Sequence, residues 1–583
     1  MSKRKKKIKK SQGQITDPVA KDTRKPPIER PTAMGMAFRT AGILEVKVAN
    51  TSLPKQDLTP QTDASGQVGQ RQKRIMRPGN VAEKSNLKDQ VIVERIKLKP
   101  KEEKPEKIKE VASIRRHESD TRPGRTQICS TDEAKSREIV IGIDFGTSCT
   151  KIVIRDRELG QAYAVPLESQ TTPGFPYFLP SRLFIDSNKV ISLISGDTCM
   201  KDIKLMLMRS PELVKKIDNN LPESVSSLEL VTGYLALTLR EARHWFLENH
   251  NAVYSGLLID WSFNIGVPSS SSEFKSHAQI YKKAALAAWW LSAQNGLLDL
   301  TLVQEALVKA EESIQQNVPI DDAGLHPELV NSFPEVIAEA VGYARSDMRP
   351  TDGTMHLLVD VGAGTMDLAM FVLHRVKDPD TESEIDQYST LLNDVCRLGA
   401  LILHEERVNY QYKFLKEKLE GLVSDDFFVS SIPGPNDYIV DQTSKVIDEC
   451  DRNFKNNCSN RIKTILLNAK RKRNPIAWIW EEGLPVILSG GGSKVPIYRK
   501  AIEESQEALG SQVVPFRLIE LNKPSRLEAQ LLAEDYHRLA VAYGLSHSVL
   551  EIGNVLPPEA IEDISISKRK THYTDNYPGA EMT

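Results

Sequence analysis

The chain has 583 residues, of which 40% are hydrophobic and 6% aromatic, and its formal net charge is −1. This length allows several domains, and no apolar run approaches the ~18 residues that span a bilayer, so we expect no transmembrane segment. The six cysteines form no Cys-x-x-Cys pair and no zinc-spaced array with histidine, which indicates reduced thiols. No hydrophobic core follows the basic N-terminus, so we expect no secretory signal and a cytoplasmic location.

The charge is divided unevenly along the chain. Residues 1–137 hold 33 Lys and Arg against 17 Asp and Glu, and the remainder holds 44 against 61. The first 136 residues contain a single aromatic residue, Phe38. We therefore expect a disordered basic arm over 1–136, with too little apolar surface to offset its chain entropy. Residues 1–10 are either a contact for a polyanion or a solvated tail, and sequence-specific nucleic-acid binding is not expected.

The first motif is Ile139-Val-Ile-Gly-Ile-Asp-Phe-Gly-Thr-Ser-Cys-Thr-Lys-Ile-Val-Ile154, which predicts a buried strand, a tight loop and a second strand. Asp144 supplies a carboxylate at the strand end, and Gly146 lets backbone approach a ligand closely. Thr147 and Ser148 add hydroxyl groups. Such a turn suits a phosphate, and the carboxylate suits the Mg²⁺ that accompanies phosphate.

Two long helices are expected before the next motif. Residues 228–247 carry an apolar stripe at helical spacing, which is typical of a core helix. Residues 273–294 form a second helix that contains Trp289 and Trp290. We expect both tryptophans to pack in the core and not to form a ligand platform.

The second motif repeats the first at Met355-His-Leu-Leu-Val-Asp-Val-Gly-Ala-Gly-Thr-Met-Asp-Leu-Ala-Met-Phe-Val-Leu373. Gly362, Gly364 and Thr365 occupy its loop. Asp367 follows Thr365 by two positions, so both side chains should face the same side of a strand. A duplicated strand–loop–strand unit suggests two similar halves that face each other across one nucleotide.

The third motif is Leu484-Pro-Val-Ile-Leu-Ser-Gly-Gly-Gly-Ser-Lys-Val-Pro-Ile-Tyr-Arg-Lys-Ala-Ile502, which predicts a strand, a triple-glycine turn and a helix. Gly490, Gly491 and Gly492 leave room for a flat ring against bare backbone, and the following helix directs its N-terminus at the site.

These three motifs, in this order over about 420 residues, resemble the nucleotide-binding domain of the heat-shock protein 70 chaperones, in the actin, sugar-kinase and chaperone ATPase superfamily. The resemblance implies an α/β protein with the actin-like ATPase fold, in which two similar lobes, each a mixed sheet flanked by helices, surround a central nucleotide cleft. It implies ATP or ADP with Mg²⁺ as ligands. We expect the first lobe over 137–355, the second over 356–556 and a disordered tail over 557–583.

The resemblance also assigns site residues. It implies catalytic roles for Lys204, Glu335, Asp367 and Asp144, and a metal role, through water, for Asp144 and Asp367. Its phosphate and adenosine contacts fall on Gly146, Thr147, Ser148, Gly362, Gly364, Thr365, Gly490, Gly491, Gly492, Ser493 and Lys494. Lys201 competes with Lys204 for the role of the lysine that neutralises the γ-phosphate.

Three positions depart from the family pattern. Glu339 stands where the family has a small residue, in the helix that crosses between the lobes. Ala363 replaces a loop glycine and is tolerable only if its φ is negative. Lys494 replaces an arginine and loses the flat stacking that a guanidinium offers.

The chaperones of this family continue into a peptide-binding domain, for which we find no counterpart here. We therefore expect a chaperone-like ATPase that hydrolyses ATP slowly and uses lobe closure as a switch on a protein partner. An actin-like filament protein, a small-molecule kinase and a nucleotide-binding pseudoenzyme remain alternatives. Assembly that depends on ATP would indicate the filament protein, and turnover stimulated by a substrate would indicate the kinase. Nucleotide binding without turnover would indicate the pseudoenzyme.

Overall fold

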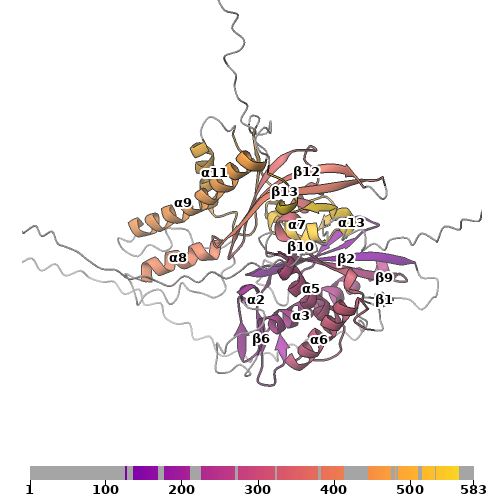
Figure 1. Ribbon diagram of the computed structural model, residues 1–583. Coiled ribbons are helices and arrows are strands. Elements are labelled where there is room, and N and C mark those ends of the chain that lie inside the picture. The colour runs from indigo at the N-terminus through magenta and orange to yellow at the C-terminus, as the bar shows by residue number, and fades with distance from the viewer. Residues whose placement is uncertain are drawn as a thin grey trace, which may run out of the picture. The chain divides into compact units, whose positions relative to one another are not determined.

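The computed structural model describes residues 125–127, 135–167, 176–209, 225–268, 274–321, 325–378, 382–412, 444–473, 480, 483–509, 515–531 and 533–563. All of these residues belong to one unit of the chain. Figure 1 draws them as coloured ribbon. The polyanion contact expected of residues 1–10 lies outside the described residues. The expected arm overlaps ordered structure at its end, because Arg125–Gln127 form strand β1 and strand β2 begins at Ser136.

The first sheet is mixed and contains eight strands. The strands are β1, β2 (Ser136–Phe145), β3 (Cys149–Asp156), β4 (Gln161–Ala164), β5 (Leu179–Pro180), β9 (Leu258–Val267), β10 (Val330–Pro334) and β16 (Leu527–Glu528). Its main order is β1-β9-β2-β3-β4-β16, with β10 also paired to β9 and β5 to β3. Residues 139–145 of β2 are all buried, as expected for a continuous apolar strand covered on both faces.

The second sheet is also mixed and contains six strands in the order β15-β14-β11-β12-β13-β17. These are β11 (Met355–Val361), β12 (Met366–Lys377), β13 (Glu384–Cys396), β14 (Pro485–Ser489), β15 (Arg517–Ile519) and β17 (Asn554–Leu556). A small third sheet joins β7 (Ile191–Ser192), β6 (Leu183–Ile185) and β8 (Thr198–Met200).

Five strands of each large sheet follow the same plan. In the first sheet, β2–β3 and β3–β4 are antiparallel pairs, whereas β2–β9 and β9–β10 are parallel. In the second, β11–β12 and β12–β13 are antiparallel, whereas β11–β14 and β14–β15 are parallel. Short turns make the antiparallel pairs, and helical crossovers bring in the parallel strands. The chain is therefore a mixed α/β protein whose two large sheets share a strand plan.

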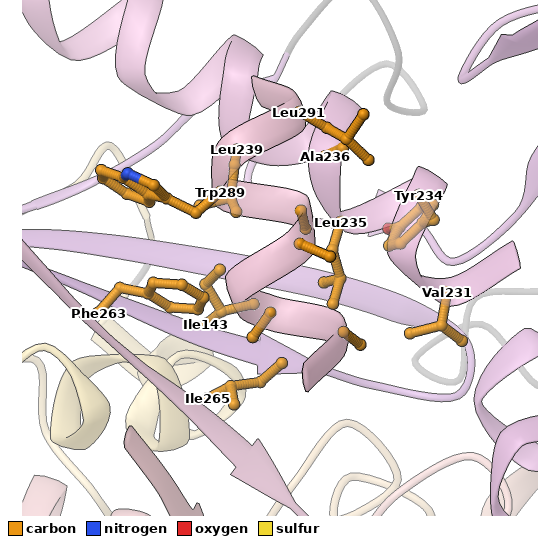
Figure 2. Close-up of a cluster of buried hydrophobic side chains, with 14 of the residues drawn as sticks. Ile143, Val231, Tyr234, Leu235, Ala236, Leu239, Phe263, Ile265, Trp289 and Leu291 are labelled. Carbon is orange, nitrogen blue, oxygen red and sulfur yellow. The ribbon is translucent and has the colours of Figure 1, made fainter. Parts of the chain in front are cut away.

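Three helices build the core beside the first sheet: α3 (Ser227–Asn249), α5 (Phe274–Ser292) and α6 (Leu300–Gln316). Ser226 starts α3 with a capping box that it forms with Glu229. The apolar faces of α3 and α5 meet side chains of β2 and β9, and Figure 2 shows Trp289 beside Phe263 in this cluster. Trp289 is fully buried and Trp290 is 9% exposed, so the expectation that both pack in the core is confirmed.

The remaining described helices are α2 (Ile203–Arg209), α4 (Asn251–Tyr254), η1 (Pro327–Leu329), α7 (Glu335–Ala344), α8 (Ala400–Tyr412), α9 (Ser444–Asn468), the π-helical turn η4 (Ala469–Arg473), α11 (Pro496–Leu509), η6 (Ala533–Arg538), α12 (Ala540–Leu545), α13 (Val549–Ile552) and η7 (Pro558–Ala560). None of the helices in the described ranges has the length and apolar character to cross a membrane. Structure also extends past residue 557, where the tail was expected to begin, since η7 follows and the described chain reaches Asp563.

The chain returns to the first sheet after it has completed most of the second. Strand β16 pairs with β4, and α12 packs against β2, β3 and β9. Both elements fall within 356–556, which the sequence assigned to the second lobe, so the division at residue 355 separates the two sheets less cleanly than expected. The helix α7 contacts β9 and β10 as well as β11 and β12, and so joins the two large sheets.

Helices α7 and α12 cross at backbone contact. A Cβ atom added to Gly544 would lie 1.8 Å from the carbonyl oxygen of Ala338, and one added to Gly342 would lie 2.4 Å from that of Ala540. Only glycine allows two helical backbones to approach this closely. The crossing is therefore fixed by a glycine on each helix.

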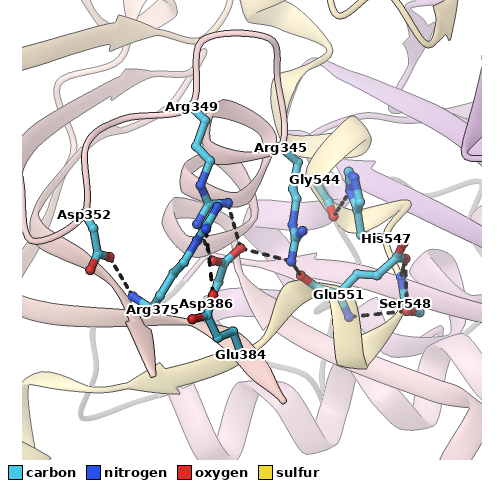
Figure 3. A network of polar contacts seen from close by, with 10 residues as sticks. All are labelled: Arg345, Arg349, Asp352, Arg375, Glu384, Asp386, Gly544, His547, Ser548 and Glu551. Atoms are coloured by element: carbon cyan, nitrogen blue, oxygen red, sulfur yellow. Dashed lines mark hydrogen bonds and ion pairs between the residues drawn. The ribbon is translucent and has the colours of Figure 1, made fainter. Parts of the chain in front are cut away.

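A polar network holds the C-terminal end of α7 against β13 and α13 (Figure 3). Asp386 on β13 accepts hydrogen bonds from both terminal nitrogens of Arg349, at 3.1 and 2.5 Å. Arg345, the residue that caps α7, lies 3.0 Å from the same carboxylate and donates to the Glu551 carbonyl oxygen at 2.5 Å. Burial opposes ionisation, but Arg349 and Arg345 outweigh it and hold the pKa of Asp386 below its usual range.

Replacing Asp386 by alanine is expected to lower the free energy of unfolding by about 1–3 kcal/mol, because a partly buried carboxylate with two arginine partners is lost. The depressed pKa means that this contribution is present above the ordinary aspartate pKa and is lost as the pH falls through the lower, folded-state value. Urea denaturation measures the change. Glu384→Ala on the same strand is the control, since its ion pair with Arg375 is 3.8 Å long and exposed, and we expect a change below about 0.5 kcal/mol. Equal losses in the two variants would contradict the assignment.

Candidate functional site

The first loop lies between β2 and β3 and is held by a serine from a distant segment. Ser181 donates from Oγ to the Gly146 carbonyl oxygen at 2.7 Å, and its N–H donates to the Ser148 carbonyl oxygen at 2.9 Å. A Cβ atom on Gly146 would lie 2.4 Å from the Cys149 carbonyl oxygen, so this turn requires glycine. Gly146, Thr147 and Ser148 are all partly exposed and available to a ligand.

A lysine stands opposite the loop's carboxylate. The β2–β3 register pairs Asp144 with Lys151, and the Lys151 Nζ lies 2.9 Å from the Asp144 Oδ2. The Asp144 residue is buried, with 6% exposed. This places a cation beside the turn that is expected to hold phosphate, where it would attract negative charge.

The second loop connects β11 to β12 and is closed by a hydrogen bond from the Gly362 N–H to the Thr365 carbonyl oxygen at 2.9 Å. The N–H groups of Ala400 and Leu401, at the start of α8, donate to the carbonyl oxygens of Gly362 and Ala363 at 3.0 and 2.9 Å. The loop thus caps this helix. Ala363 does not adopt a positive φ, which meets the condition for an alanine there.

The third loop, between β14 and α11, is fastened to the end of β11. Gly490 has φ = +82°, and a Cβ atom on it would lie 2.1 Å from the Asp360 Oδ1. The Gly492 N–H donates to the Val361 carbonyl oxygen at 2.8 Å. Both glycines are therefore required by close packing on the second motif.

The rest of the third loop faces outward. Gly491 and Ser493 are partly exposed, and Lys494 is exposed. Helix α11 starts at Pro496, where proline needs no hydrogen-bond partner for its nitrogen. The structure thus leaves Gly491, Ser493 and Lys494 accessible from solvent, whereas Gly492, which the resemblance also assigns to this contact, is buried.

The first and second loops face each other. The Thr147 Oγ1 lies 3.7 Å from the position that a Cβ atom on Gly364 would take. The side chain of Leu205, from α2, approaches the same position within 3.7 Å. Two loops that are more than 200 residues apart in the chain thus meet where the repeated motifs predict a shared ligand.

Helix α2 also contributes a buried lysine to this region. The Lys204 Nζ lies 2.7 Å from the Oε1 of Glu335, the first residue of α7, and both side chains are buried. Burial raises the pKa of Glu335, whereas the charge of Lys204 acts in the opposite direction. Lys204 and Glu335, to which the resemblance assigns separate roles, are therefore in direct contact.

Two aspartates stand opposite each other at the ends of β11 and β12. Asp360 pairs with Asp367 in the antiparallel register. Burial, followed by the charges of Glu335 and Asp144, raises the pKa of Asp360 to about 7. Burial and the neighbouring Asp360 raise the pKa of Asp367 well above its usual range. Perturbed carboxyl groups gathered at strand ends are typical of functional sites.

A shallow recess adjoins these acids, and in this structure it has no room for a water molecule. Glu335 and Asp367 line it together with Asn393, and the other lining residues are Val267, Pro268, Val336, Leu368 and Val395. The Oδ1 of Asp367 is buried and has no hydrogen-bond partner among the described residues. The two acids therefore line one recess, and one oxygen of Asp367 is an unused acceptor within the described part of the chain.

The donor set fits a hydrated magnesium ion better than a directly coordinated one. Within the described ranges, no group of three or more His, Cys, Asp and Glu side chains is close enough to hold a metal ion. The unused Asp367 oxygen is a suitable acceptor for a metal-bound water, and Mg²⁺ commonly keeps several waters. Asp144 and Asp367 would hold such an ion through that shell.

Sequence reasoning missed two residues of this cluster. Lys151 could have been found from the expected strand register. A short turn after Phe145 places Lys151 opposite Asp144 on the neighbouring strand. Asp360 belonged to the quoted motif but received no role, although burial and the nearby charges of Glu335 and Asp144 raise its pKa. Lys201, the competing lysine, lies just before α2, whereas Lys204 lies within the helix and contacts Glu335.

No protein-family model matches this sequence, and no curated protein is significantly similar to it.

Proposed function

We propose that the chain is a Mg-ATP-binding protein of the actin, sugar-kinase and heat-shock-chaperone type, closest to the chaperone ATPases, which hydrolyses ATP slowly and uses lobe closure as a switch on a protein partner. The observation that carries the proposal is the meeting of the repeated loops. Thr147 faces Gly364 across the ends of two sheets that share one strand plan. The third glycine loop is packed on the second through Gly490 and Asp360.

In this proposal the residues of the site perform three tasks. Thr147, Ser148, Gly364 and Thr365 contact phosphate oxygens, and the exposed part of the third loop contacts the adenosine. Lys204 neutralises the charge that develops on the terminal phosphate, and Lys151 adds a second cation beside Asp144. Magnesium, when bound, screens the phosphate charge and fixes its orientation.

Hydrolysis requires a water molecule in line with the γ-phosphorus. The water oxygen forms a bond to phosphorus while the bond to the β–γ bridging oxygen breaks, giving ADP, phosphate and a proton. Glu335 and Asp367, which line one recess, are the acids whose carboxyl oxygens would orient the water. Lys204 holds Glu335 in place through the 2.7 Å contact.

The test is Mg-ATP binding and phosphate release by the full chain and by Asp367→Asn. We expect slow turnover by the wild-type chain and a 10²- to 10³-fold lower rate in the variant, because one electrostatic contact to the reacting groups is lost. Nucleotide affinity should stay within about tenfold. Asp352→Asn, which removes a carboxylate on an exposed turn, is the control and should leave both quantities unchanged.

Each outcome separates the proposal from its alternatives. Binding without turnover by the wild-type chain indicates a nucleotide-binding switch without hydrolysis. Turnover that appears only with ATP-dependent pelleting indicates a filament protein, and turnover stimulated by a small hydroxylated substrate indicates a kinase. No nucleotide binding would refute the proposal.

A further inference from the structure

Ser181 contacts the first loop at two carbonyl groups. Its Oγ donates to the Gly146 carbonyl oxygen at 2.7 Å, and its N–H donates to the Ser148 carbonyl oxygen at 2.9 Å. Ser181 itself is buried, with 4% exposed, whereas residues 146–148 of the loop are partly exposed. Ser181 therefore covers the carbonyl side of the loop and leaves the opposite side to a ligand.

The direction of the Ser181 hydroxyl group is fixed by a neighbour. The Thr150 Oγ1 lies 3.1 Å from the Ser181 Oγ. A serine hydroxyl has one hydrogen atom, and that of Ser181 is donated to the Gly146 carbonyl oxygen. The Thr150 hydroxyl must therefore be the donor to Ser181, so the two hydroxyl groups and the carbonyl form a chain of hydrogen bonds that ends on the loop.

The two carbonyl groups determine where the neighbouring N–H groups of the loop point. In a trans peptide, the C=O of one residue and the N–H of the next lie on opposite edges of the peptide plane. Because the Gly146 carbonyl points at Ser181, the Thr147 N–H points away from it. The Ser148 carbonyl turns the Cys149 N–H away from the same serine. N–H groups gathered on one side of a turn form a concavity that binds anions.

Two other parts of the chain hold the segment that carries Ser181. Strand β5, which directly precedes it, pairs antiparallel with β3. The Arg538 guanidinium carbon lies 3.6 Å from the centroid of the Phe178 ring, and the Gln530 N–H donates to the Tyr177 hydroxyl oxygen at 2.6 Å. The serine is thus placed by contacts that do not involve the loop, which is the arrangement that preorganises a binding group.

The charges beside the loop indicate the class of ligand. The Lys151 Nζ lies 3.3 Å from the position that a Cβ atom on Gly146 would take, and 2.9 Å from the Asp144 Oδ2. The lysine and the N–H groups suit a ligand with several negative charges. The Asp144 carboxylate suits the magnesium ion that accompanies a polyphosphate.

We propose that Ser181 is a positioning residue, which turns the N–H groups of Thr147 and Cys149 toward the uncovered side of the first loop and so makes this loop a subsite for a polyphosphate chain. The inference rests on the proposed function for the presence of a nucleotide here, although the subsite itself recognises phosphate oxygens and neither base nor ribose. Ser181 acts through the loop. Its loss should therefore weaken polyphosphate binding without changing the affinity for an uncharged nucleoside.

The test is the affinity of the full chain for tripolyphosphate, ADP and adenosine, measured by calorimetric titration in the presence of magnesium for the wild-type chain and Ser181→Ala. We expect the variant to bind tripolyphosphate and ADP about 10- to 100-fold more weakly, because hydrogen bonds to charged oxygens lose their alignment. The affinity for adenosine should be unchanged. Equal weakening of all three ligands would mean that Ser181 only stabilises the fold, and would contradict the proposal.

Two further variants control for the loss of a buried hydroxyl group. Ser313→Ala in α6 removes a serine that is 3% exposed and donates to the Val318 carbonyl oxygen at 2.6 Å, and it should leave all three affinities unchanged. Ser181→Cys keeps nearly the same volume and offers only a weak donor. It should show the same selective loss as Ser181→Ala without a cavity.

The three ligands separate failure of this inference from failure of the proposed function. If ADP and tripolyphosphate bind equally well to the wild-type chain and to both Ser181 variants, Ser181 is not a positioning residue, whereas the proposed function stands. If the wild-type chain binds tripolyphosphate but no adenine nucleotide, the proposed function is wrong, and a selective loss in the variants still supports the role of Ser181. A wild-type chain that does not bind tripolyphosphate refutes the inference.

Discussion

Replacing Lys204 by methionine is expected to lower the rate of ATP hydrolysis about 10²- to 10³-fold while nucleotide affinity changes by less than about tenfold. Methionine keeps the length of the side chain and removes the charge that would stabilise the departing phosphoryl group. Steady-state phosphate release gives the rate, and titration with a fluorescent ATP analogue gives the affinity. Lys201→Met is the matched control, because it removes a positive charge three residues away, just before α2, and leaves the Lys204–Glu335 pair in place.

A loss of stability has to be separated from a loss of catalysis in this variant. Removing Lys204 leaves Glu335 buried without its partner, and breaking a buried pair costs about 3–5 kcal/mol. The double variant Lys204→Met, Glu335→Gln removes that stranded charge, so we expect it to regain most of the stability but none of the turnover. Recovery of turnover in the double variant would show that neither Lys204 nor the Glu335 carboxylate acts directly in catalysis.

Replacing Gly544 by alanine is expected to lower the free energy of unfolding by about 3 kcal/mol or more. The new Cβ atom would lie 1.8 Å from the carbonyl oxygen and 2.7 Å from the carbonyl carbon of Ala338, so one helix backbone must shift. Overpacking against side chains typically costs about 1–3 kcal/mol, and backbone gives way less easily. Urea denaturation followed by tryptophan fluorescence measures the loss.

The control for this prediction is Gly233→Ala in helix α3. Its new Cβ atom would meet the Ile191 Cδ1 at 2.7 Å, which is the far end of a flexible side chain. Alanine is also about 1 kcal/mol more favourable than glycine inside a helix, so this change should be close to neutral. Equal destabilisation by the two substitutions would mean that the helix crossing is not the sensitive point.

The crossing of α7 and α12 and the candidate site share one helix. The α7 segment begins with Glu335, which contacts Lys204, and its next turn carries Glu339. Its last residues are held by Arg345 against Asp386. A change in the packing of α7 would therefore move Glu335, which contacts Lys204.

Local chemistry explains which parts of the fold the sequence predicted. The strand–loop–strand units around Asp144 and Asp360 were found because buried strands, a glycine turn and a hydroxyl form a continuous local pattern. The helix ending near Leu247 and the burial of Trp289 followed from apolar spacing in the same way. The roles of Lys204, Glu335, Asp144 and Asp367 in catalysis remain predictions.

Such local patterns do not predict contacts between segments that are distant in the sequence. Ser181 supports the first loop from 33 residues beyond Ser148, and nothing in its own neighbourhood distinguishes it from other serines. The return of β16 and α12 to the first sheet also has no local signal, so the sequence placed both with the second.

The sequence by itself determined the two repeated loops, the triple-glycine turn and the types of side chain that they carry, because strand and turn preferences act over a few residues. Only the tertiary structure decided that Lys204 meets Glu335, that Asp360 opposes Asp367, and that Glu339 has no partner. Burial and the nearness of charges set the pKa of a carboxyl group, and both depend on segments that come together only when the chain folds.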